Sequence, residues 1–205
     1  MHHYLKDTEF AVENLFKLAT GEEKMLRELA LRLANVEEQL RVNMWDFESS
    51  DLNDDFSEGY VMAAFGRMAK AHQEAATLQS QMTSIQASIG SHQQAMQTIS
   101  GAILQIAKQG ISIVYGGIEA APEGRKLGSL PIRDIIWQSR NQAMHFECDS
   151  FHKPVTALFA KLESEYGSQF SLVQHANQSR AKQVLGLLSW NNYEHYLNDM
   201  ALLLL

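Results

Sequence analysis

The chain has 205 residues and a formal net charge of −7, and its composition is 45% hydrophobic and 20% charged. This length and composition suit one globular domain with a substantial core. The acidic balance excludes a general nucleic-acid coat protein, which needs many Lys and Arg residues to displace counterions, but it leaves room for a small basic site.

The cysteine content and the two ends of the sequence bear on the compartment that we expect for the chain. The single cysteine, Cys148, rules out an intramolecular disulfide and favours a reducing compartment. The first ten residues lack the apolar stretch of a signal peptide, and the apolar run at 200–205 is far too short to cross a bilayer. We therefore expect a soluble, cytoplasmic protein that does not enter a membrane.

Apolar residues recur with helical spacing along most of the chain, which predicts an all-α fold in one domain, residues 1–205. N-terminal helices are expected within 6–44, then an acidic loop at 46–57 and a long helix, rich in Gln and Ala, at 58–108. The apolar residues of the long helix alternate in steps of four and three, the spacing of a coiled-coil seam. The seam consists of Leu78, Met82, Ile85, Ile89, His92, Met96, Ile99, Ile103 and Ile106.

The long helix has a neutral polar face and two internal glycines, Gly90 and Gly101. Each glycine costs about 1 kcal/mol relative to alanine inside a helix. They indicate either close helix contacts or a break. The neutral face predicts packing on both sides, against the same chain and against a second copy.

The second half of the chain holds the three prolines. We expect a loop at 116–130, a helix at 131–149 that Pro131 opens, and C-terminal helices within 152–203. The only strand-like run is ISIVYGG at 111–117. The C-terminal helices are expected at about 152–165, 169–188 and 190–203.

Three polar residues stand close together in the stretch IRDIIWQSRNQAMHFE: Arg140, Asn141 and His145. Asn141 and His145 are four residues apart, so on a helix they share one face, together with Trp137. Arg140 lies about 140° around the axis from His145, but its side chain is long enough for all three groups to reach one site. The opposite stripe, expected to face the core, consists of Ile132, Ile135, Ile136 and Ala143.

These residue types suit the cleavage of RNA without a metal ion. A histidine takes and gives protons near neutral pH, an arginine fork fits a phosphate, and an asparagine amide binds a phosphate oxygen or orients the imidazole. In this reaction the 2′-hydroxyl attacks the adjacent phosphate, His145 moves protons and Arg140 stabilises the phosphorane. An acid and a base are both needed, so a two-fold dimer that pairs two copies of the helix would complete the site.

The segment SRNQAMH resembles the Arg-polar-x3-His motif of HEPN domains, all-α bundles found in toxins, abortive-infection proteins and CRISPR-associated ribonucleases. The resemblance covers the motif helix closely and residues 60–205 only in general character. It implies a HEPN-like bundle that dimerises through the motif helix, with Arg140, Asn141 and His145 as the catalytic residues of a composite site. It also implies a metal-independent endoribonuclease without a cofactor, acting on RNA as a toxin or phage-defence effector. In some such systems the antitoxin partner is nucleotidyltransferase-like.

Other interpretations of the polar cluster stay open. The spacing of Arg140 and His145 recurs at Arg67 and His72, where Met68 replaces the polar residue, so we interpret that second match as chance. The three residues would also suit a solvated helix face in a non-catalytic oligomerisation or interaction module of the same fold.

A metal site is a third interpretation. On a continuous helix His145, Cys148 and His152 would share a face, and all three are competent zinc ligands. Pro154 and the lack of a fourth ligand argue against this site. The aromatic cluster near the C-terminus is expected to serve packing; it consists of Trp190, Tyr193, His195 and Tyr196.

Overall fold

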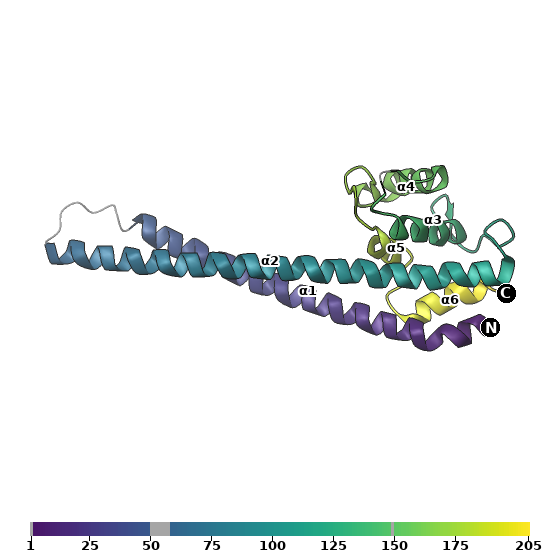
Figure 1. Cartoon of the computed structure of the whole chain (residues 1–205), viewed down its shortest axis with the longest axis horizontal. Coiled ribbons are helices and arrows are strands. Elements are labelled where there is room, and N and C mark those ends of the chain that lie inside the picture. The colour runs from purple at the N-terminus through teal and green to yellow at the C-terminus, as the bar shows by residue number, and fades with distance from the viewer. Residues whose placement is uncertain (1, 50–57, 149) are drawn as a thin grey trace. The chain divides into compact units, whose positions relative to one another are not determined.

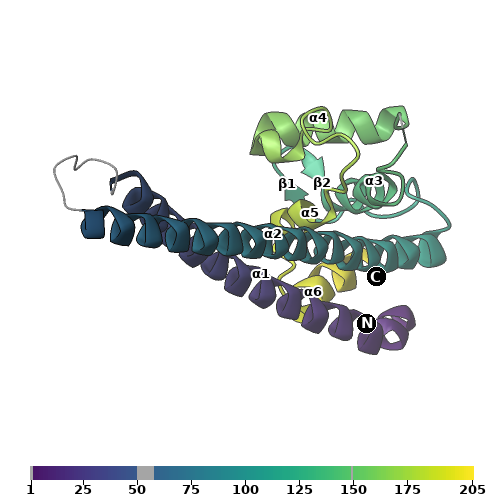
Figure 2. The same cartoon turned by 60° about the vertical axis from the view of Figure 1, so that its left-hand side comes forward.

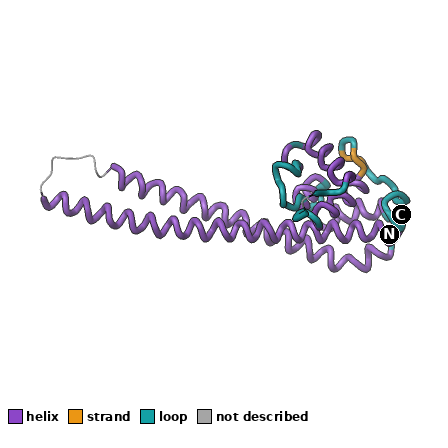
Figure 3. The backbone as a smooth tube through the Cα atoms, turned by 45° about the horizontal axis from the view of Figure 1, so that its top comes forward, coloured by secondary structure: helices purple, strands orange, loops and turns teal. Residues whose placement is uncertain are grey.

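The computed structural model describes residues 2–49, 58–148 and 150–205. In these residues nearly all regular structure is helical, apart from one short antiparallel hairpin (Figure 3). The predicted all-α class is therefore confirmed. None of the described helices is both long and apolar enough to cross a membrane.

The elements and their bounds differ in places from the prediction. They are α1 (His3–Ser49), α2 (Glu58–Tyr115), β1 (Lys126–Leu127), β2 (Leu130–Pro131), α3 (Ile132–Met144), α4 (Lys153–Tyr166), the 3-10 turn η1 (Ser168–Phe170), α5 (Ala181–Leu187) and α6 (Tyr193–Leu203). The chain divides into two compact units, one formed by residues 1–22 and 94–205 and the other by residues 23–93. Helices α1 and α2 each contribute to both units. The sequence predicts a single domain that spans both.

The unit of residues 23–93 is an antiparallel pair of helices built from parts of α1 and α2. All seam residues predicted in α2 are buried or partly buried, in this unit and in the other, and Ile85 is only 6% exposed. Between 78 and 94 most of the intervening residues are exposed, as expected for a single apolar seam. From residue 99 to 108 every residue of α2 is at least partly buried, because other helices cover it there.

In the unit of residues 1–22 and 94–205, α2 lies between two groups of helices (Figures 1 and 2). Helices α3, α4 and α5 lie on one side of α2, and α6 lies on the other side with the start of α1. The largest fully buried side chains of this core include Trp190, Tyr196, Phe159, Phe170, Ile103 and Leu104. Trp190 and Tyr196 thus serve packing, as predicted, and their rings are 4.9 Å apart at an angle of 77°. The same prediction is wrong for His195, which is exposed.

Several predicted element bounds are wrong. One helix, α1, forms in place of the several expected within 6–44. Residues 46–49 of the predicted acidic loop belong to it, whereas 50–57 lie outside the described residues. The strand-like run at 111–117 is helical as far as Tyr115, and Gly116 ends α2 with a positive φ of 76°. The predicted loop at 116–130 contains β1 and the first residue of β2.

Another correction concerns residues 169–180, which are predicted to be helical. Apart from η1 they form turns, and Asn177 has a left-handed φ of 57°. Serine side chains compete with helical hydrogen bonds here. The hydroxyl of Ser171 accepts from the N–H of Gln174 at 3.3 Å, and that of Ser179 accepts from the N–H of Ala181 at 3.2 Å. The helical pattern of apolar residues cannot reveal this competition.

A close helix contact accounts for Gly110 of α2, and the helix continues without a break through Gly90, Gly101 and Gly110. A Cβ on Gly101 would lie 3.7 Å from the Cβ of Ala143, an ordinary contact with α3. A Cβ on Gly110 would lie 2.7 Å from Cε1 of Tyr4 and 3.0 Å from Cδ1 of Leu204. Gly90 has open space around it.

We expect Gly110→Ala and Gly90→Ala to change stability in opposite directions. At Gly90 alanine adds only helix propensity, a gain of about 1 kcal/mol. At Gly110 the added methyl group overpacks the core, a loss of about 1–3 kcal/mol that exceeds this gain. The ring of Tyr4 has little freedom to move, because its hydroxyl donates to the carbonyl of Ile106 at 2.8 Å. Urea midpoints of both variants check the signs, and equal stabilisation would contradict the close contact at Gly110.

Candidate functional site

Helix α3, which carries the predicted site, is firmly anchored in the fold. Its apolar stripe faces the core as predicted, with Ile132, Ile135 and Ile136 at most 1% exposed. At its start the N–H of Ile132 donates to the carbonyl of Arg125 at 2.9 Å, so a backbone donor that a helix start leaves unpaired is satisfied. The helix also packs against α4 and α5. The polar side of α3 is therefore presented on a rigid element.

Arg140 and Asn141 lie together, as the sequence predicts. The guanidinium of Arg140 donates through Nε to the side-chain oxygen of Gln105 on α2, and through Nη1 to Oδ1 of Asn141 at 3.3 Å. The amide of Asn141 donates in turn to Gln138 at 3.4 Å. Arg140 is partly buried, yet no carboxylate among the described residues forms an ion pair with it. Its guanidinium is thus oriented by neutral groups and keeps donors for another ligand.

His145 lies at the end of the helix that carries this pair. Helix α3 ends at Met144, so the prediction that it continues to residue 149 is wrong. His145 is the C-cap residue with φ −129° and ψ 23°, and its N–H donates to the carbonyl of Gln142 at 3.2 Å. Its side chain is exposed and forms no hydrogen bond with any described residue. Among the described residues no hydrogen bond fixes the imidazole, so it is available to a substrate or a partner.

A second cation, Lys108 on α2, lies near Arg140. The Nζ atom of Lys108 is 4.3 Å from the centroid of the Trp137 ring, the geometry of a cation–π contact. Burial, and next the charge of Arg140, lower the pKa of Lys108 below its ordinary value. Trp137, predicted to point outward, is partly buried against the edge of the core. Sequence reasoning missed Lys108. The signal that could have drawn attention to it is its isolation, because it is the only Lys or Arg between residues 71 and 124.

Gln142, a residue of the motif, has a structural role that the sequence did not predict. Its side chain is 1% exposed and bridges two backbone groups of the segment before α5. The amide donates to the carbonyl of Gln178 and its oxygen accepts from the N–H of Arg180, both at 2.9 Å. The helical spacing of Ile135, Ser139 and Gln142 could have indicated that Gln142 is buried, because it places all three on one face of α3.

The residues weighed as metal ligands do not share a helix face. His145 and Cys148 lie in turns after α3, and His152 is the N-cap residue of α4, so the continuous helix that the zinc interpretation requires does not form. The described residues contain no group of three His, Cys, Asp or Glu side chains placed to hold a metal ion.

The second Arg–His match lies within α2. His72 is exposed, whereas the side chain of Arg67 lies outside the described part of the structure. The interpretation of this match as chance therefore stays a prediction.

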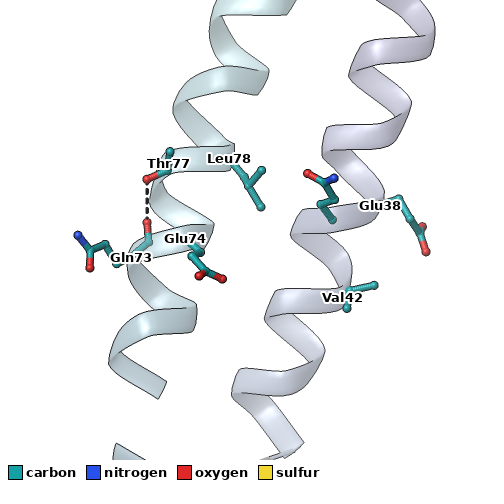
Figure 4. Close-up of a pocket in the computed structure, with 7 residues that line it drawn as sticks. Glu38, Val42, Gln73, Glu74, Thr77 and Leu78 are labelled. Carbon is teal, nitrogen blue, oxygen red and sulfur yellow. Dashed lines mark hydrogen bonds between the residues drawn. The ribbon is translucent and has the colours of Figure 1, made fainter. Parts of the chain in front are cut away.

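Two surface hollows lie away from the motif residues. One, of ≈ 610 Å³, lies in the unit of residues 23–93 between α1 and α2, where Glu74 and Leu78 of α2 extend toward α1 (Figure 4). It is lined by Glu38, Gln39, Val42, Gln73, Glu74, Thr77 and Leu78. The other, of ≈ 670 Å³, is lined by residues of α1 such as Glu9 and Glu13, and by residues 191–194 and Leu197 at and within α6. Neither is lined by Arg140, Asn141 or His145.

The site on α3 thus consists of an oriented arginine with an asparagine beside it, a second cation over a tryptophan, and an exposed histidine at the helix end. This set can bind phosphate groups and move protons. Comparison of the chain with protein-family models, with curated proteins and with solved structures gives no match.

Proposed function

We propose that this chain is a HEPN-like endoribonuclease that cleaves RNA without a metal ion. The observation that carries the proposal is the guanidinium of Arg140, which is partly buried, oriented by Gln105 and Asn141, and without an acidic partner in the described residues. A partly buried cation is costly unless an anion meets it. A phosphate of the RNA backbone is such an anion, and the arginine fork fits it.

The proposed reaction assigns one task to each residue. The 2′-oxygen of a ribose forms a bond to the adjacent phosphorus while the bond from phosphorus to the 5′-oxygen of the next nucleotide breaks. A base takes the proton of the 2′-hydroxyl, and an acid gives a proton to the leaving 5′-oxygen, so that a 2′,3′-cyclic phosphate and a 5′-hydroxyl result. Arg140 binds the charge that builds on the phosphorane, and Asn141 keeps the guanidinium oriented. His145 carries the proton transfers.

Two proton transfers call for more than the one imidazole that a single chain offers. We therefore propose a homodimer in which the α3 helices of two copies face each other and supply two histidines and two arginines. The exposure of His145 at the end of α3 supports this, because an exposed imidazole is available to a site shared with a second copy. The roles of toxin or phage-defence effector, and a nucleotidyltransferase-like antitoxin as partner, belong to the same proposal and rest on the motif resemblance.

Incubation of a fluorescent single-stranded RNA with purified protein in EDTA tests the proposal. We expect the wild-type protein to cut the RNA, and Arg140→Ala and His145→Ala each to slow cutting by about 10²-fold or more. His152→Ala and Arg32→Ala are matched controls, since both replace exposed side chains outside the site, and we expect both to cut like the wild type.

Equal cutting by all five proteins would indicate a contaminating nuclease and would overturn the proposal. No cutting by the wild type on varied RNAs would favour the non-catalytic alternative. The dimer has its own readout, because the rate per molecule of a composite site must fall when dilution separates the copies. A constant rate per molecule across dilution, with a monomeric mass, would contradict the composite site.

A further inference from the structure

Lys108 occupies an unusual place for a lysine. It is partly buried on α2, in a stretch that is otherwise free of Lys and Arg from residue 71 to 124. Its Nζ atom lies 4.3 Å from the centroid of the Trp137 ring, so the indole on α3 holds the ammonium of α2 beside α3. Lysine side chains usually extend into water, and fixing one against a ring costs rotamer entropy.

Among the described residues, no carboxylate forms an ion pair with either cation at this place. In the same unit Arg125 pairs with Asp199 at 2.7 Å, and Arg133 with Asp134 at 3.0 Å. In contrast, neither Lys108 nor Arg140 forms an ion pair with a carboxylate in residues 2–49, 58–148 or 150–205. The two cations are close enough for the charge of Arg140 to lower the pKa of Lys108, so they repel each other.

Two adjacent cations without a counter-ion are expected where the ligand supplies the negative charge. Arg140 alone would suffice for one phosphate, whereas a strand of RNA brings a second phosphate to the neighbouring position. Gln105 strengthens this arrangement, because it lies one helical turn before Lys108 on α2 and binds Arg140 directly. Both cations are thus fixed by the contact between α2 and α3 rather than by flexible surface loops.

We propose that Lys108 binds a phosphate of the RNA next to the one at Arg140, and that Trp137 is the positioning residue that holds its ammonium there. This inference rests on the proposed function, since it takes RNA as the ligand. It adds a residue of α2 to the site, outside the motif on α3. The RNA strand would then lie along the contact between α2 and α3.

Binding of a single-stranded RNA with 2′-O-methyl groups tests the inference, because this RNA lacks the attacking hydroxyl and stays intact. Fluorescence anisotropy at several salt concentrations gives both the affinity and its salt dependence. We expect Lys108→Gln to weaken binding about tenfold and to reduce the slope of log K against log salt by about 0.7. Lys108→Arg keeps the charge and should restore most of both. Lys161→Gln, an exposed lysine of α4, is the matched control and should change neither.

Trp137→Leu separates positioning from direct contact. We expect it to weaken binding about two- to fivefold in the wild-type background, and to have no further effect in the Lys108→Gln background. Equal losses in both backgrounds would overturn the positioning role of Trp137. Circular dichroism of each variant checks that the helices remain.

The outcomes for Lys108 and for cleavage are distinguishable. If Lys108→Gln binds like the wild type, the inference is overturned, while cutting of unmodified RNA by the wild type still supports the proposed function. If Lys108→Gln binds more weakly but the wild type cuts no RNA, the phosphate-binding role stands and the nuclease proposal fails. If the wild type does not bind the 2′-O-methyl RNA at all, the inference is overturned.

Discussion

Replacement of Asp199 by alanine is expected to lower the free energy of unfolding by about 3 kcal/mol or more. Asp199 is 9% exposed, and its carboxylate accepts three hydrogen bonds, two from Arg125 at 2.7 and 2.8 Å and one from Nε1 of Trp190 at 2.7 Å. Its removal leaves the indole N–H of Trp190 buried without a partner and removes the counter-charge of Arg125. The side chain of Arg125 is 38% exposed, so water compensates part of that loss and the effect lies at the lower end for a buried pair.

The network around Asp199 joins parts of the chain that are far apart in sequence. Arg125 also donates to the carbonyl of Leu188 at 2.7 Å, so the loop before β1 is tied both to α6 and to the turn after α5. Urea denaturation of Asp199→Ala measures the loss in free energy of unfolding, provided that the m value is unchanged. Glu123→Ala is the control: its ion pair with Lys126 is more than half exposed on both sides, and its loss is expected to change stability by less than about 0.5 kcal/mol. A loss no larger for Asp199→Ala than for Glu123→Ala would contradict the buried network.

Replacement of Gln142 by alanine or leucine is the second large effect, a loss of about 2–3 kcal/mol. Either change leaves the carbonyl of Gln178 and the N–H of Arg180 without the side chain that pairs them. Leucine refills most of the volume, so a similar loss in both variants assigns the effect to hydrogen bonds rather than to a cavity. Gln138→Ala, on the same helix with one long hydrogen bond to Asn141, should cost less than about 1 kcal/mol.

Hydrogen exchange locates the effect of Gln142. The amide of Arg180 should exchange faster in both variants, because its N–H then lacks an acceptor. If the Arg180 amide stays fully protected from exchange and the urea midpoints are unchanged, Gln142 does not fix the segment before α5. Such a result would also mean that α3 and α5 are held together by apolar contacts alone.

The sequence predicts best the features that neighbouring residues determine. The seam of α2 and the buried stripe of α3 follow from apolar spacing, since one helix face repeats every three to four residues. For the same reason Ile103, Ile135 and Ile136 are placed correctly in the core. The start of α3 is predicted to within one residue, because Pro131 favours a helix start.

The features set by distant residues could not be predicted in this way. No glycine or proline lies between 140 and 150, so the sequence contains no visible reason for α3 to end at Met144. The turns before α5 depend on Gln142, whose bonds span more than thirty residues of chain. The candidate site shows the same limit: Arg140 and Asn141 are adjacent in sequence and lie together, whereas Gln105 and Lys108 reach them only through the contact between α2 and α3.

The turn after α3 offers a practical means to observe the site. Cys148 is the only cysteine of the chain, it is exposed, and its N–H donates to the carbonyl of His145 at 3.0 Å. A thiol-reactive spin label would therefore attach at one defined point beside the histidine, without any engineered cysteine. Pulsed electron paramagnetic resonance on such a sample measures the separation of two labels, and so of the two α3 helices when copies associate. The unmodified sequence thus already carries the reporter needed to follow assembly of the site in solution.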